Sequence, residues 1–127
     1  MKKKVFIVDD NETNLMMARD ALEKDFSVIT IISGERLFTI LNKILPDIIL
    51  LDIEMPGMSG YKVIGRLKAN EAYASIPVVF ITGIQGEDIL DKAREAGAVG
   101  VIHKPFICSE LPGMVLSFCE LPIDERT

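Results

Sequence analysis

The chain has 127 residues, with 14 Lys and Arg against 19 Asp and Glu, a formal net charge of −5 and a hydrophobic content of 49%. This apolar content excludes an intrinsically disordered chain, and the acidic balance argues against direct nucleic-acid binding, which requires a basic face. The length fits a single domain over residues 1–127 that folds without a metal or a disulfide.

Short apolar runs alternate with longer segments of helical periodicity, beginning with residues 4–9. This first run is β-branched and aromatic and too short for a helix, so it predicts a buried strand. From Asn11 to about Lys24 apolar residues recur three and four positions apart, which predicts an amphipathic helix capped by Asn11 or Asp10. The next predicted elements are a strand over 27–31 and a helix that opens at 33–35 and continues to Leu45.

The second half of the chain continues this alternation. Residues 48–52 are uniformly apolar up to Asp52, as in a strand covered on both faces. Pro112 and Gly113 disfavour a helix interior, so the last helix is expected to be short or to start late; with Ser109 as its cap, Pro112 falls in the first turn. The other predicted elements are a helix over 61–68, a strand over 77–82, a helix over 86–96 closed by Gly97, a strand over 99–103 and the final helix within 106–119.

Five β–α units with short connections predict an α/β fold, an open doubly wound five-stranded parallel sheet with helices on both faces. An eight-stranded barrel needs roughly 250 residues, twice the present length. The open sheet is therefore expected, in the flavodoxin-like strand order 2-1-3-4-5.

No export or membrane segment is expected. The apolar run that follows the N-terminal lysines stops at Asp9-Asp10, whereas a secretory signal needs roughly 7–15 apolar residues. The apolar run 48–51 is far shorter than the ~18 residues that cross a bilayer. Cys108 and Cys119 lack metal-site spacing and are interpreted as small hydrophobic residues in a reducing compartment, which predicts a cytoplasmic protein.

Polar residues follow four of the predicted strands at their carboxyl ends. Asp9 and Asp10 follow the first strand, Asp52 ends the third, Thr82 ends the fourth, and Lys104 comes directly after the fifth. In an open α/β sheet these ends meet in the crevice where the strand order reverses. The sequence therefore predicts a site at this edge of the sheet.

The chemistry of these residues points to phosphoryl transfer. Three converging carboxylates repel one another unless a cation neutralises them, and all-oxygen ligands without His or Cys favour Mg²⁺. Lys104 suits a phosphoryl oxygen, and the Thr82 hydroxyl can donate to another, which supplies positioning and an electrostatic clamp. Asp52, on the central strand, is the expected nucleophile because a carboxylate can form an acyl phosphate.

Four motifs in chain order resemble the receiver domain of two-component response regulators, and the resemblance covers almost the whole chain. They are Asp9-Asp10 after an apolar strand, the segment 51–61 (LDIEMPGMSGY), Ile81-Thr82-Gly83, and His103-Lys104-Pro105-Phe106.

The resemblance implies a bacterial phosphorelay switch rather than a turnover enzyme. Asp52 would accept a phosphoryl group from a phosphohistidine on a sensor histidine kinase or a histidine phosphotransfer protein. Asp10, Asp52 and the backbone carbonyl of Glu54 would ligate Mg²⁺ directly, with Asp9 acting mostly through water. Thr82 would move to bond the phosphoryl group.

Other implications of the resemblance concern the region around Lys104, which would pair with a phosphoryl oxygen. Pro105 occupies the family's cis-proline position, where a cis bond would hold the lysine inward.

The face formed by the fourth helix, fifth strand and fifth helix would change on phosphorylation and contact an output domain or a second copy. The chain departs from the family at Val101, where Tyr or Phe is usual, so an aromatic readout is in doubt. Glu54 and Ile84 occupy positions that tune loss of the phosphoryl group.

Three alternatives remain open from the sequence. The chain is consistent with a receiver-like module that binds a partner without being phosphorylated. A haloacid-dehalogenase-type phosphatase would need its Asp nucleophile on the first strand and a second Asp two residues later, where this chain has Glu54 after Asp52. A flavin carrier would need a hydroxyl- and glycine-rich phosphate loop after the first strand. A stand-alone regulator and a piece of a longer protein with an output domain are both compatible with the sequence.

Overall fold

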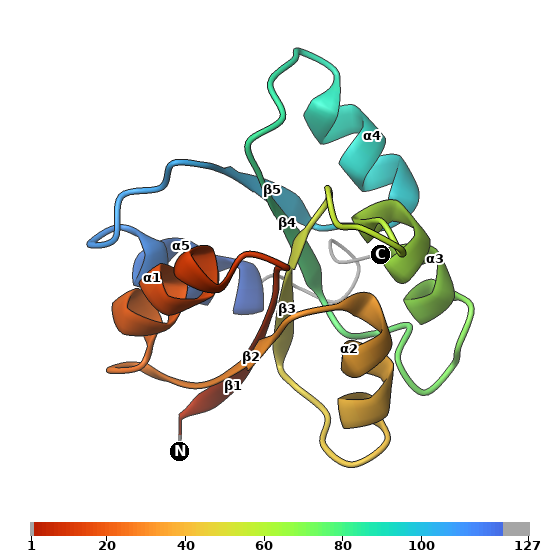
Figure 1. Ribbon diagram of the computed structural model, residues 1–127, viewed down its shortest axis with the longest axis horizontal. Coiled ribbons are helices and arrows are strands. Elements are labelled where there is room, and N and C mark those ends of the chain that lie inside the picture. The colour runs from red at the N-terminus through yellow and green to blue at the C-terminus, as the bar shows by residue number, and fades with distance from the viewer. Residues whose placement is uncertain (1, 121–127) are drawn as a thin grey trace.

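The structure is a computed structural model that describes residues 2–120. Within this range five strands alternate with five helices (Figure 1). They are β1 (Lys3–Val8), α1 (Glu12–Leu22), β2 (Phe26–Ile31), α2 (Gly34–Leu41), β3 (Ile48–Asp52), α3 (Gly60–Lys68), β4 (Val78–Thr82), α4 (Ile89–Ala96), β5 (Gly100–His103) and α5 (Leu111–Cys119).

The strands form one parallel sheet in the order β2-β1-β3-β4-β5, which confirms the predicted fold. Helices α2, α3 and α4 pack on one face, and α1 and α5 pack on the other (Figure 1). The central strand β3 is completely buried because its successive side chains enter the two cores in turn. Ile49 and Leu51 join the core under α2–α4, whereas Ile48 and Leu50 join the core under α1 and α5. A strand covered on both faces has no position for a solvent-facing polar residue, which explains its uniform apolar sequence.

Three predicted helix boundaries differ from the observed ones by two residues or more. Helix α2 ends at Leu41 rather than at Leu45, and Leu45 is 53% exposed, so its apolar spacing does not reflect burial. Helix α4 begins at Ile89 rather than at Gly86, because Gly86 has φ +147°, which lies outside the helical region. Helix α1 ends at Leu22, two residues before the predicted end.

The helix starts show which capping residues the chain uses. Asn11 caps α1, since its side-chain oxygen accepts a hydrogen bond from the Asn14 backbone N–H at 3.0 Å. The late start of α5 is confirmed: the helix begins at Leu111 and Pro112 lies in its first turn. The residue before the helix is Glu110, so the expectation of Ser109 as the cap is wrong by one position.

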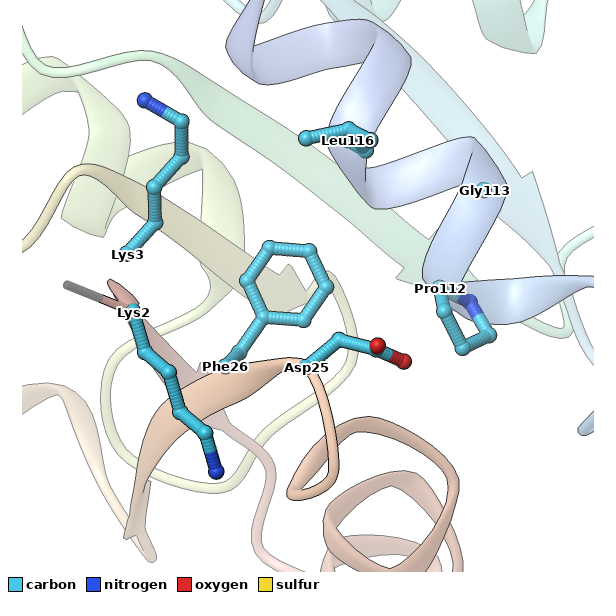
Figure 2. A pocket seen from close by; sticks show the side chains of 7 residues that line it. All are labelled: Lys2, Lys3, Asp25, Phe26, Pro112, Gly113 and Leu116. Atoms are coloured by element: carbon cyan, nitrogen blue, oxygen red, sulfur yellow. The ribbon is translucent and has the colours of Figure 1, made fainter.

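A groove of about 440 Å³ lies where β1 and β2 begin, at the amino end of the sheet, whereas the predicted site lies at the carboxyl end. Its side chains come from the starts of these strands and from α5, and Figure 2 shows Phe26 between Lys3 and Asp25, with α5 passing beside them. The ammonium group of Lys2 donates to the carbonyl of Glu23 at 3.0 Å, close to the end of α1. The groove therefore contains none of the predicted site residues. Across residues 2–120, no helix is both long and apolar enough to span a membrane.

Candidate functional site

The five predicted side chains lie at the carboxyl end of the sheet. Asp9 and Asp10 directly follow β1, Asp52 and Thr82 are the last residues of β3 and β4, and Lys104 directly follows β5. In the register of β3 with β4, Asp52 is level with Ile81, so Thr82 lies one residue further along the neighbouring strand. Asp9, Asp52 and Thr82 are buried and Asp10 is exposed, which leaves the crevice with a solvent-facing side.

The three aspartates form a compact group of oxygen donors. Each offers one carboxylate oxygen, and the three oxygens all lie within 4.8 Å of one another. Oxygen ligands of one octahedral Mg²⁺ ion lie roughly 3–4 Å apart, because each sits about 2.1 Å from the ion. Small side-chain rotations would close the difference. The residues therefore fit a hard divalent cation, with Asp10 providing the exposed side.

Lys104 neutralises part of this acidic group. Its Nζ donates to Oδ2 of Asp9 at 2.8 Å and lies 3.7 Å from Oδ1 of Asp52, with its side chain only 19% exposed. The other oxygen of Asp9 accepts the Asn11 backbone N–H at 2.9 Å. Both oxygens of Asp9 accept short hydrogen bonds, whereas Asp10 is exposed and Lys104 lies 3.7 Å from Asp52, so Asp10 and Asp52 are the better placed of the three to ligate a cation directly.

Burial raises the pKa of Asp52 from 3.8 to about 6 in the metal-free protein. The nearby Lys104 ammonium opposes this rise, as does a hydrogen bond from the Glu54 backbone N–H, while the charges of Asp9 and Asp10 add to it. The repulsion among three converging carboxylates that the sequence predicts is therefore a smaller cause of the raised pKa. Desolvation is the larger cause, and it depends on the packing around β3.

The Thr82 hydroxyl is fully buried and accepts the Ile84 backbone N–H at 3.0 Å. The Thr82 carbonyl accepts the Lys104 backbone N–H at 2.8 Å, which joins the ends of β4 and β5. A hydroxyl that accepts one hydrogen bond still has its own hydrogen to donate. Thr82 is therefore able to donate to a group bound in the crevice.

The turns next to the site hold both expected and unexpected features. The Lys104–Pro105 peptide bond is cis, as the resemblance implied. Glu54 is exposed in the loop after β3.

Val101 is half-buried opposite Phe80 in the β4–β5 register and packs on the core under α2–α4. The ring that contacts Phe80 comes instead from Tyr61 at the start of α3, in an edge-to-face arrangement with centroids 5.3 Å apart.

Gly60 supports the site in a way that the sequence pattern did not predict. Its backbone N–H donates to the Ile53 carbonyl at 2.8 Å, and it begins α3 after the Ser59 cap. A Cβ atom at this position would lie 2.5 Å from the backbone oxygen of Asp52 and 2.7 Å from the Cα of Ile53. Glycine therefore allows α3 to approach the strand end that carries Asp52. The only sequence signal for this was a glycine after Ser59 in a turn.

Replacing Gly60 with alanine is expected to destabilise the protein by about 2–3 kcal/mol, because a backbone clash cannot relax by side-chain rotation. Gly65 in the same helix is the matched control: a Cβ atom added there would meet nothing within 4 Å, so Gly65→Ala should stabilise by about 0.5–1 kcal/mol. Urea unfolding followed by circular dichroism measures both changes. Equal effects of the two substitutions would contradict the close approach at Gly60.

The chain is similar to known signalling proteins over most of its length. The sequence profile of the response regulator receiver domain family matches residues 5–116. Response regulator PleD of Caulobacter vibrioides is 36% identical over 106 residues, which cover 83% of this chain and 23% of PleD. The polar-differentiation response regulator DivK of Brucella ovis is 35% identical over 106 residues, covering 83% of this chain and 86% of DivK. The chain thus spans about a quarter of PleD's length but most of DivK's.

Solved structures show the same architecture. The BeF₃-activated DrrB receiver domain, from Thermotoga maritima, superposes with a TM-score of 0.83 at 26% sequence identity. The match covers 95% of this chain and 100% of that domain.

Proposed function

Because the chain belongs to the response regulator receiver domain family, whose members are two-component signalling switches, we propose that Asp52 is its phosphorylation site. One observation carries the assignment. The Lys104 ammonium lies within reach of two buried carboxylates, Asp9 and Asp52, and of the two Asp52 lies on the central strand. We propose that residues 1–127 contain this one receiver unit.

The proposed reaction moves a phosphoryl group from a phosphohistidine to Asp52. A carboxylate oxygen of Asp52 forms the new O–P bond while the P–N bond to the donor imidazole breaks, and the imidazole nitrogen keeps the electron pair. Lys104 already lies 3.7 Å from Oδ1 of Asp52, so its charge would stabilise the negative oxygens of the transferred group. Thr82, with a hydroxyl hydrogen to donate, would bond a second phosphoryl oxygen.

Asp10, Asp52 and the Glu54 backbone carbonyl would hold Mg²⁺ directly, and Asp9 would contribute through water. A bound Mg²⁺ supplies positive charge that stabilises the phosphoryl oxygens during transfer. Two facts support this division: Asp9 has both oxygens occupied by Asn11 and Lys104, and Asp10 is exposed.

Phosphorylation would act by shifting a pre-existing equilibrium between two packings around Thr82. Movement of its hydroxyl toward the phosphoryl group would break the hydrogen bond from the Ile84 N–H and rearrange the loop before α4. The face formed by α4, β5 and α5 would carry the change to an output domain or a second copy. Val101 replaces the usual ring there, so the readout would depend on helix movement rather than on an aromatic rotamer. The protein would be a switch that is reset by slow hydrolysis, not a turnover enzyme.

A sensor histidine kinase or a histidine phosphotransfer protein is the proposed partner. The greater length of PleD is consistent with a receiver that is attached to an output domain. The similar length of DivK is consistent with a receiver that acts as a separate protein. The alternative, a receiver-like module that is never phosphorylated, predicts a different result in a labelling experiment.

Incubation with a small-molecule acyl phosphate and Mg²⁺ is expected to add one phosphoryl group to the chain. Intact-protein mass spectrometry measures the addition, and borohydride reduction of the acyl phosphate followed by peptide mapping locates it at Asp52. Chelation of Mg²⁺ should abolish labelling. Absence of labelling in Mg²⁺ favours the unphosphorylated module, and labelling at another residue contradicts the assignment of Asp52.

A further inference from the structure

The free edge of the sheet at β2 carries an apolar surface outside the phosphorylation site. Strand β2 is terminal in the strand order, and α1 packs against it. Two neighbouring apolar side chains are strongly exposed: Met16 on α1 is 64% exposed, and Ile32, which follows β2, is 49% exposed. Edge strands are commonly protected by charged residues or proline, but β2 (FSVITI) has neither.

Two shallow hollows make this surface continuous. One has a volume of about 260 Å³ and lies between α1 and the end of β2; the other, of about 180 Å³, lies between the end of β2 and α2. Both are lined by Thr30 and by the exposed Ile32, so these two side chains lie between the hollows. Met16 lines the first hollow and Ile40 of α2 the second. An exposed side chain beside a hollow can insert into the corresponding hollow of a second copy.

The charges along α1 are self-complementary. Glu12, Met16 and Arg19 are spaced four and three residues apart, so they lie on one face of the helix, and all three line the same hollow. When two such helices pack antiparallel about Met16, Glu12 of each lies opposite Arg19 of the other. The existing contact of Arg19 with Glu23 is 3.6 Å long and more than half exposed, so it holds Arg19 weakly.

We propose that this edge is a self-association surface that binds a second copy of the chain. The two copies are related by a two-fold axis through Met16, as in other isologous interfaces. Met16 and Ile32 of each copy form the apolar centre, and the two Glu12–Arg19 pairs flank it. The axis passes beside the carboxyl end of β2, where Thr30 and Ile32 line the same hollow as Met16. The association goes beyond the proposed phosphorylation switch and does not require Asp52.

Sedimentation velocity of the full chain over a range of concentrations tests the proposal. We expect a concentration-dependent dimer, and Met16→Glu should weaken it by about tenfold or more because it places two like charges on the axis. Met17→Glu is the matched control, since Met17 is also exposed, at 45%, but lies on a different face of α1. A chain that stays monomeric throughout, or that loses its dimer equally in both variants, overturns the proposal.

A charge exchange identifies the contacting residues. Glu12→Arg and Arg19→Glu should each weaken the dimer, whereas the double variant should restore it because both pairs are re-formed with reversed sign. Failure of the double variant to recover overturns the proposed pairing.

The Asp52→Asn chain should dimerise normally. A dimer that requires phosphorylation would instead belong to the α4–β5–α5 face, and this result contradicts the edge proposal without affecting the assignment of Asp52.

Discussion

Replacing Asp52 with asparagine is expected to abolish phosphoryl labelling and, in the metal-free protein, to raise the free energy of unfolding. The loss of labelling follows from the amide, which cannot form an acyl phosphate. The gain in stability follows from burial: the Asp52 side chain is only 9% exposed, and its pKa rises from 3.8 to about 6 on folding. Asparagine keeps an oxygen that can accept the Glu54 backbone N–H but carries no charge to desolvate.

The pH dependence of this effect has a definite sign. A carboxyl group with a raised folded-state pKa binds its proton more tightly in the native protein than in the unfolded chain. Its contribution to stability is therefore greatest below about pH 4 and is lost as the pH rises toward 6. The full loss is about 3 kcal/mol, which sets the upper limit for the gain in Asp52→Asn at about pH 7.5. Near pH 4 the two proteins should differ little.

Urea unfolding in the presence of a chelator, at about pH 4 and about pH 7.5, measures both free energies. Asp20→Asn is the control, because Asp20 is an exposed aspartate on α1 away from the site, and it should change stability by less than about 0.5 kcal/mol. Addition of Mg²⁺ should stabilise the parent protein more than the Asp52→Asn variant, since binding to the native state alone raises stability. Lower stability of the metal-free variant at about pH 7.5 would show that burial of this carboxylate carries no net cost.

Replacing Lys104 with methionine is expected to impair both stability and phosphorylation. The methionine side chain fills a similar volume but leaves Asp9 without its 2.8 Å partner and removes the cation nearest to Asp52. Breaking a buried ion pair from one side typically costs about 3–5 kcal/mol, so we expect at least about 2 kcal/mol at neutral pH. Loss of a group that stabilises transferred charge should slow labelling by about a hundredfold.

Lys92→Met is the matched control for the loss of a lysine. Lys92 also pairs with an aspartate, Asp88 at 3.1 Å, but both side chains are more than 60% exposed, so the change should be below about 1 kcal/mol. Labelling should be unaffected because Lys92 lies on α4, outside the site. If Lys104→Met behaves like the control in unfolding and labelling, the lysine is not the electrostatic partner of this site.

Much of the fold was predictable because its signals are local. The buried run 48–52 and the three- and four-residue spacing after Asn11 report strand and helix periodicity within a few neighbours. Alternation of these elements then leaves few topologies, so the parallel sheet and its strand order followed. Helix ends were less predictable: Leu45 has the right spacing for α2 but no surface to pack on, and Gly86 adopts a non-helical φ.

The sequence by itself determined which residues meet, since parallel strands bring their carboxyl ends to one edge of the sheet. The order of the strands and the residues at their ends are therefore enough to predict that Asp9, Asp10, Asp52 and Lys104 lie together. Only the tertiary structure decided how they interact: that Lys104 bonds Asp9 more closely than Asp52, and that burial more than repulsion raises the pKa of Asp52. Distances and desolvation depend on packing between segments far apart in the chain, which no local pattern records. Three of the 19 acidic side chains gather in this crevice, and only the structure shows that Asp9 and Asp52 are buried whereas Asp10 is exposed.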